Sequence, residues 1–146
     1  MFDGIVLSHS HIDHAGFIPF IRSDIPFYAS EGSLAILKAM EQTSYGFYEF
    51  LELKEKFKIR ESKREKGKYI RDRDSSIRRE IVSLKSDFKI GEFSFHFFPI
   101  DHSIVGATAY VIETQEGSIV YTGDIRFHDL LFVKFVELSL SRKKQR

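Results

Sequence analysis

The sequence predicts an α/β protein in which helices flank a mixed β-sheet. Strand-like apolar runs recur along the chain, and one long segment carries apolar residues at helical spacing. The length agrees with this class, because 146 residues with 42% apolar content are enough to bury the core of a domain. We therefore expect one layered α/β domain.

The first elements alternate between strand and helix. Residues 3–8 are apolar enough for a buried strand, and residues 26–29 form a second, shorter one. Between them, residues 15–22 are predicted as a short helix that Pro19 interrupts. This order places a helix beside a sheet from the start of the chain.

A longer helix is predicted next, ending near Gln42, with Ser30 or Ser33 as its N-cap. Its core-facing side consists of apolar side chains at helical spacing: Leu34, Ile36, Leu37 and Met40. A further helical stretch is predicted for residues 47–58.

A charged segment, residues 60–79, is predicted to be a mobile insertion because it has few apolar anchors. Residues 49–80 contain 12 Lys and Arg against 8 Asp and Glu, and residues 142–146 add four basic side chains. The rest of the chain has 6 basic and 13 acidic residues. Basic segments beside an acidic centre suit a phosphodiester substrate. Interspersed charges of both signs are also typical of a solvated helix. For residues 49–80 taken alone, this second interpretation is favoured.

Strand-like patterns dominate the second half of the chain. Strands are predicted at residues 80–84, 92–98, 107–113 and 118–122. The turn at residues 115–117 separates the last two, as expected of an antiparallel hairpin. Phe93, Phe95 and Phe97 alternate onto one face of their strand, so His96 on the other face is interpreted as structural.

Three histidines and an aspartate occur within residues 9–14, directly after the first predicted strand. Imidazole and carboxylate are ligands that zinc and related divalent metals prefer. Side chains alternate along an extended chain, so His9 and His11 can point to the same side. Asp13 and His14 follow as the chain turns toward the helix. Four ligands on one bend exceed what one tetrahedral ion with an open position needs, which predicts two metals.

This His-x-His-x-Asp-His pattern resembles the signature of the metallo-β-lactamase superfamily. The resemblance extends to a later single histidine, His102, and to Asp124, each after an apolar strand-like run. Both are therefore expected at the carboxyl ends of strands, beside the first cluster. Three later stretches are similar to the ribonuclease J-like, β-CASP branch of nucleases: residues 101–107, 111–114 and 121–128. The similarity covers residues 1 to about 137, except residues 43–80.

The resemblance implies part of an αββα sandwich that holds two divalent ions, zinc or else manganese. The implied ligands are His9, His11 and His102 for one metal, Asp13 and His14 for the second, and Asp124 as a bridge between them. The chain has no Cys, so no thiolate can bind the metal. The implied activity is phosphodiester hydrolysis of RNA, or else DNA, by metal-activated water. Asp13 is the expected catalytic residue, since it can orient that water.

Two other functions stay open at this point. One is a small-molecule hydrolase acting on an ester, thioester or lactam. Such enzymes tend to carry a Gly-His-Thr-Pro-Gly type turn where this chain has Asp101-His102-Ser103. The other is an inactive metal-binding fragment. By resemblance, residues 1–146 are a partial domain without the first strands of the family, a complete β-CASP domain or a later metal-binding histidine, so a single tightly held metal is expected.

Two further expectations concern the location of the protein and a last histidine. No apolar run approaches the length of a membrane span, so a cytoplasmic protein without membrane contact is expected. His128 lies four residues beyond Asp124. It is interpreted as a surface histidine, with a role near the substrate as the alternative.

Overall fold

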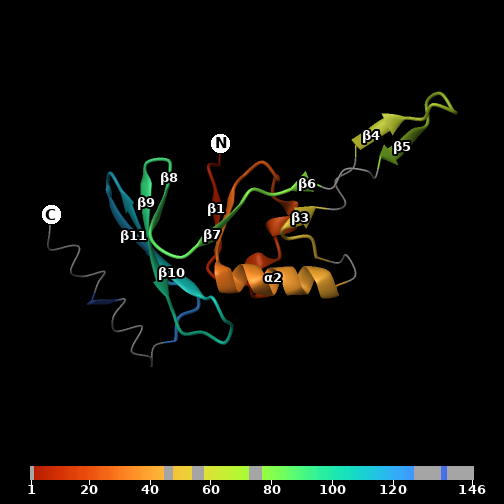
Figure 1. The fold of residues 1–146 in the computed structure, drawn as a ribbon. Helices are drawn as coiled ribbons and strands as arrows, with labels where there is room; N and C mark the ends of the chain where they lie inside the picture. Colours follow the sequence, from red (N-terminus) through yellow and green to blue (C-terminus); the bar gives the residue numbers. More distant parts are fainter. Residues whose placement is uncertain (1, 45–47, 54–57, 73–76, 127–135, 138–146) are drawn as a thin grey trace.

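The computed structural model describes residues 2–44, 48–53, 58–72, 77–126 and 136–137. Within these ranges two larger β-sheets pack on one another, and one long helix covers the first of them (Figure 1). Two further sheets have only two strands each. The predicted α/β class is confirmed. Parallel strands form one of the two packed sheets and antiparallel strands form the other.

The first sheet has three parallel strands in the order β1-β2-β7. They are β1 (Ile5–Val6), β2 (Phe27–Ser30) and β7 (Ile81–Leu84). Ile5 pairs with Phe27, and Phe27 pairs with Ile81. Because parallel strands end at the same edge of a sheet, the residues after β1 and after β2 emerge side by side.

The second sheet is antiparallel, in the order β11-β10-β9-β8. Its strands are β8 (Phe88–Ile90), β9 (Phe93–Pro99), β10 (Thr108–Thr114) and β11 (Gly117–Tyr121). The last three predicted strands are confirmed to within one residue at each end. The predicted hairpin is confirmed by the pairing of Thr114 with Gly117. β8 was not predicted, because so short a strand shows no clear alternation.

Three helical segments are described: α1 (Ile12–Ala15), the 3-10 helix η1 (Ile18–Phe20) and α2 (Glu31–Thr43). The single helix predicted for residues 15–22 is wrong. α1 begins inside the histidine motif, and Pro19 lies in the first turn of η1, where no N–H is needed. α2 is confirmed, with the Ser30 hydroxyl accepting a hydrogen bond from the Ser33 N–H at 3.2 Å. None of the described helices is long and apolar enough to cross a bilayer.

α2 packs on the first sheet through three of the four side chains predicted for its core-facing side, whereas Ile36 belongs to none of the described core clusters. Leu37 is fully buried, in a cluster with Phe27 and Ala29 of β2. Leu34 and Met40 pack against the same cluster. The helix therefore buries one face of the parallel sheet.

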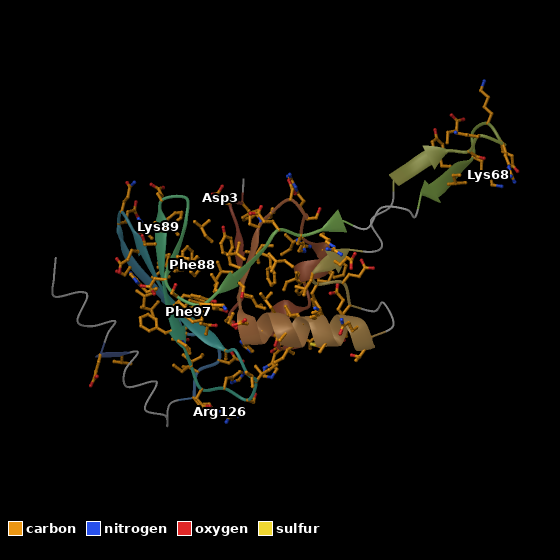
Figure 2. The ribbon with its side chains drawn as sticks, in the orientation of Figure 1. Asp3, Lys68, Phe88, Lys89, Phe97 and Arg126 are labelled. Carbon is orange, nitrogen blue, oxygen red and sulfur yellow. The ribbon has the colours of Figure 1, made fainter. Side chains whose placement is uncertain are left out.

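The other face of the parallel sheet packs against the antiparallel sheet. Tyr110 and Phe95 of the second sheet are buried together with Leu84 of the first. Phe88 and Phe97 are among the partly buried side chains that pack against this cluster (Figure 2). Two of the three phenylalanines predicted on one face of β9, Phe95 and Phe97, thus serve the packing of sheet on sheet, whereas Phe93 is exposed.

Two hydrogen bonds tie the second sheet to the end of β1. The Tyr110 hydroxyl donates to the carbonyl oxygen of Leu7 at 2.9 Å, and the Thr108 N–H donates to that of Ser8 at 2.9 Å. Burial raises the pKa of Tyr110 to about 12, so the hydroxyl remains a donor at neutral pH. The start of β10 is thereby held beside the histidine motif.

Between α2 and β7, the described residues form two small antiparallel sheets. β3 (Glu52–Leu53) pairs with β6 (Ile77–Arg78), and β4 (Lys58–Glu61) pairs with β5 (Tyr69–Asp72). The helix predicted for residues 47–58 is therefore wrong where this segment is described. The Glu41 Oε1 atom accepts hydrogen bonds from the N–H groups of Leu51 and Glu52, at 3.3 and 3.0 Å. This tertiary contact supports an extended course that local spacing cannot reveal.

Arg79, at the end of this charged segment, is buried. Its guanidinium donates hydrogen bonds to four main-chain carbonyl oxygens: those of Ile18, Ile21, Arg22 and Phe50. Burial lowers the pKa of Arg79, but a guanidinium still remains protonated at neutral pH. The segment predicted to be a mobile insertion thus ends in a residue that fixes the loop following α1.

Candidate metal centre

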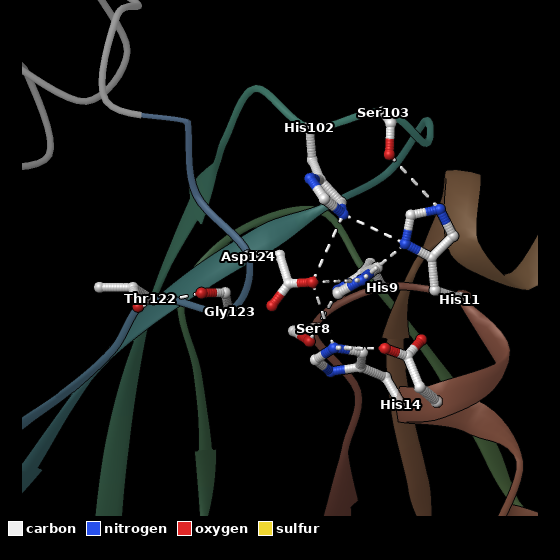
Figure 3. Close-up of polar contacts among 10 residues, drawn as sticks. Ser8, His9, His11, His14, His102, Ser103, Thr122, Gly123 and Asp124 are labelled. Atoms are coloured by element: carbon white, nitrogen blue, oxygen red, sulfur yellow. Dashed lines mark hydrogen bonds and ion pairs between the residues drawn. The ribbon is translucent and has the colours of Figure 1, made fainter.

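The side chains predicted as metal ligands come together between the end of β1 and the loops of the second sheet (Figure 3). His9 follows β1, the next three ligands lie in or just before α1, His102 lies in the β9–β10 loop, and Asp124 follows β11. Their donor atoms form two groups, each within 4.8 Å: His9, His11, His102 and Asp124 in the first, and Asp13, His14 and Asp124 in the second. Asp124 belongs to both groups.

The first group has the spacing of ligands around one tetrahedral ion. The Nδ1 atom of His11 lies 3.1 Å from Nε2 of His9 and 3.1 Å from Nε2 of His102. Oδ2 of Asp124 lies 3.7 Å from each of those two Nε2 atoms. Zinc–nitrogen bonds of about 2.0–2.1 Å place two nitrogens of a tetrahedral ion roughly 3.3 Å apart. The donor types and their spacing therefore fit an ion of this size.

The second group lies on the solvent side of the first. Nε2 of His14 is 3.4 Å from Oδ2 of Asp124 and 3.8 Å from Oδ2 of Asp13. The side chain of Asp13 is 74% exposed and that of Asp124 is 45% exposed, whereas His9 is fully buried. Asp124 thus joins a buried group of donors to an open one through a single carboxylate oxygen.

His9 is kept neutral by its surroundings. Burial, together with the neighbouring His14 and His102, lowers the pKa of His9 to about 4, against an opposing effect of Asp124. The Ser8 hydroxyl lies 3.1 Å from Nδ1 of His9. If the hydroxyl accepts the Nδ1 proton, the Nε2 lone pair faces the other donors, as a metal ligand requires.

The other two imidazoles of the first group differ in how they are supported. Nε2 of His11 is 3.5 Å from the Ser103 hydroxyl. Nδ1 of His102 is buried and has no hydrogen-bond partner among the described residues, as is also true of the Ser10 hydroxyl. Ser8 and Ser103 were missed in the sequence, where the only available signal is that each directly adjoins a ligand histidine.

The β9–β10 loop that carries His102 is held by the N-terminus of α2. The carbonyl oxygen of Gly106 accepts hydrogen bonds from the hydroxyls of Ser30 and Ser33, at 2.5 and 3.0 Å. Gly106 has φ +84°, and a Cβ atom there would lie 2.4 Å from the backbone nitrogen of Ser33. A Cβ atom at Gly32 would in turn lie 2.9 Å from Cα of Gly106. The backbone of the β9–β10 loop at Gly106 and the N-terminus of α2 at Gly32 therefore approach each other at a distance that only glycine allows.

We expect the metal-free protein to lose stability as the pH falls from about 6.5, the ordinary pKa of histidine, to about 4, the pKa of folded His9. Within this window the unfolded chain binds a proton that folded His9 does not, so acid favours unfolding; above the window this contribution is constant. Denaturant titrations of chelator-treated protein at several pH values measure the effect. The His9→Gln variant should show a weaker dependence over the same range. An identical dependence in both proteins would contradict the assignment to His9.

Two other histidines lie outside these groups or outside the described residues. His96 contacts Oδ2 of Asp87 through Nδ1 at 2.7 Å, and its Nε2 is 4.0 Å from Oε1 of Glu113. It takes no part in either donor group, as expected of a structural histidine. His128 and the basic residues 142–146 lie outside the described residues.

A sandwich of two sheets with two histidine–aspartate groups that share one carboxylate defines a metallo-β-lactamase type of domain. The chain belongs to this superfamily, because the family model described as "Beta-lactamase superfamily domain" matches residues 1–135. The resemblance seen in the His-x-His-x-Asp-His pattern is thereby confirmed.

The curated relatives of the chain include ribonucleases. It is 29% identical to the ribonuclease J of Mycolicibacterium smegmatis, over 88% of this chain and 18% of that protein. It is 29% identical to the protein named "Probable RNase MJ4" of Methanocaldococcus jannaschii, over 96% of this chain and 31% of that protein. The chain therefore spans less than a third of the length of either relative.

A solved structure shares the fold. A protein of unknown function from Enterococcus faecalis superposes with a TM-score of 0.63 at 24% identity, over 94% of this chain and 28% of that one. This likeness agrees with the two-sheet architecture described above.

Proposed function

We propose that this protein is a metal-dependent hydrolase that cleaves phosphodiester bonds in RNA. The observation that carries the proposal is the shared carboxylate: Oδ2 of Asp124 is 3.7 Å from Nε2 of His9 and 3.4 Å from Nε2 of His14. A carboxylate in this position lets two divalent ions lie side by side, the arrangement used in phosphodiester cleavage. The relatives named ribonuclease J support RNA as the substrate.

Each ion has its own set of residues in this proposal. The first would be held by His9, His11, His102 and Asp124, and the second by Asp13, His14 and Asp124. Zinc suits imidazole and carboxylate donors best, and manganese is the alternative. When bound, such ions lower the pKa of water and neutralise charge on a phosphate.

Asp13 has a second task besides holding a metal. Its side chain is the most exposed of the six ligands, at 74%, and its Oδ2 lies 3.8 Å from Nε2 of His14. A carboxylate that faces solvent beside the metal ligands can accept a hydrogen bond from the attacking water and take up its proton. We assign Asp13 as the residue that orients this water.

The sequence of the loop that carries His102 favours a phosphodiester substrate over a small-molecule substrate. This loop reads Asp101-His102-Ser103, and the Ser103 hydroxyl lies near Nε2 of His11. The Gly-His-Thr-Pro-Gly type of turn, to which the small-molecule hydrolases of the superfamily tend, does not occur in this loop.

The proposal is tested by assaying the full-length protein, loaded with zinc or with manganese, on four substrates in parallel. These are a labelled single-stranded RNA, a DNA of the same sequence, a chromogenic lactam and a glutathione thioester. We expect cleavage of the RNA that stops on adding a chelator and is lost in the Asp13→Asn variant. Turnover of the lactam or thioester without RNA cleavage would overturn the proposal.

A further inference from the structure

A hairpin formed by β4, β5 and the loop between them, residues 58–72, stands apart from the packed sheets (Figure 1). Its strands pair only with each other in the part of the chain that the structure describes. Of the hairpin residues whose side chains the structure describes, 61–70, none belongs to a core cluster. Packing of the core therefore does not account for the tip of the hairpin.

The tip of the hairpin has an excess of positive charge that its own carboxylates do not neutralise. Glu65 pairs with Lys68 at 2.9 Å, and Glu61 accepts a hydrogen bond from the Gly67 N–H at 2.7 Å. Lys68 lies at the tip in Figure 2. Three further basic side chains, all exposed, form no ion pair with another described residue: Lys63, Arg64 and Lys66.

The tip also has a hollow and an exposed aromatic ring. The hollow has a volume of about 540 Å³ and is lined by Ser62, Lys63, Arg64, Glu65, Lys68 and Ile70. This volume lies within the roughly 300–1,000 Å³ of small-ligand sites. Tyr69 is 68% exposed. Because side chains alternate along β5, its ring lies on the other face of the strand from Ile70.

We propose that the tip of hairpin β4–β5 binds the backbone of single-stranded RNA, at a place separate from the metal centre. Lys and Arg attract phosphates, and an exposed aromatic ring can stack on a base of any sequence. The hairpin thus holds one part of the RNA chain while another part of the same RNA reaches the ligands around Asp124. This inference rests on the proposed function, since it takes RNA as the substrate.

The test measures binding without cleavage, so that its outcome does not depend on hydrolysis. Chelator-treated full-length protein is titrated into a labelled oligouridylate, and fluorescence anisotropy is read at several salt concentrations. The triple variant Lys63→Gln, Arg64→Gln, Lys66→Gln should bind at least about tenfold more weakly at low salt. Its slope of log affinity against log salt should flatten by about 2, since each lost phosphate contact removes roughly 0.7. Tyr69→Ala should weaken binding about tenfold with little change in slope.

A matched control removes three lysines from the body of the protein: Lys38→Gln, Lys85→Gln and Lys89→Gln. All three side chains are exposed. The net charge changes as in the hairpin variant, because each variant loses three positive charges. This control should bind RNA within about threefold of the parent protein, and both triple variants should keep the metal content and thermal unfolding of the parent. Equal losses in both triple variants, or no loss in the hairpin variant, would overturn the proposal. Tighter binding of an acidic peptide than of RNA by the same hairpin residues would also overturn it, in favour of a protein partner.

Discussion

Replacing Asp124 with alanine is expected to remove tightly bound metal from both donor groups and to abolish hydrolysis. Among the residues that the structure describes, its Oδ2 atom is the one carboxylate oxygen shared by both donor groups. The substitution therefore leaves three imidazoles in one group and two ligands in the other. Removing a shared anion also leaves two cations close together without the charge between them. Metal content after dialysis, measured by elemental analysis, and zinc titration by calorimetry test this expectation.

Single-group variants make the test sharper. His11→Ala should weaken chiefly the metal held by the first group, and His14→Ala chiefly the metal held by the second. Because the first group has four donors and the second has three, we expect the ion in the first group to be the more tightly held. Asp24→Ala is the matched control, since this exposed aspartate pairs with Arg22. The same metal content in all four variants would refute the ligand assignment.

Replacing Gly106 with alanine is expected to loosen the His102 loop and to lower metal affinity in the first group. The positive φ of +84° costs an L-residue about 1–2 kcal/mol. The new Cβ atom would lie 2.4 Å from the backbone nitrogen of Ser33 and 2.8 Å from the carbonyl carbon of Gly32, so the loop must move away from α2. The hydrogen bonds from Ser30 and Ser33 would then weaken, each a loss of about 1 kcal/mol. We expect a destabilisation of roughly 2–4 kcal/mol and a decrease in zinc affinity of about 10- to 100-fold.

Gly67→Ala separates the effect of backbone conformation from the effect of contact. Gly67 has almost the same φ, +82°, but a Cβ atom added there meets nothing within 4 Å. This variant should lose only the roughly 1–2 kcal/mol that the positive φ costs, and it should bind zinc like the parent protein. Urea unfolding and zinc calorimetry on the two variants distinguish these outcomes. Full zinc affinity in Gly106→Ala would contradict the inference that contact between Gly106 and α2 positions His102.

Local spacing was enough to predict much of the antiparallel sheet. Alternation along residues 92–122 predicted three of its strands to within one residue, because side chains on a strand report directly which face is buried. The same kind of reasoning failed for residues 47–58. In its described part, the extended course at Glu52–Leu53 depends on the pairing of β3 with β6 and on hydrogen bonds that the N–H groups of Leu51 and Glu52 donate to Glu41. All of these partners lie ten or more positions away in the sequence.

For the metal centre, the sequence by itself determined the types of ligand and their order. His9 to His14 are close together along the chain, so their proximity needs only a strand and a turn. The tertiary structure decided which atoms converge: Nδ1 of His11 faces Nε2 of His102, more than ninety residues away. It also decided that Gly106 meets Ser30 and Ser33, and that Arg79 is buried among carbonyl oxygens. These contacts arise when two sheets and a helix pack together, and no local pattern records them, because each residue's own neighbours in sequence are compatible with many other packings.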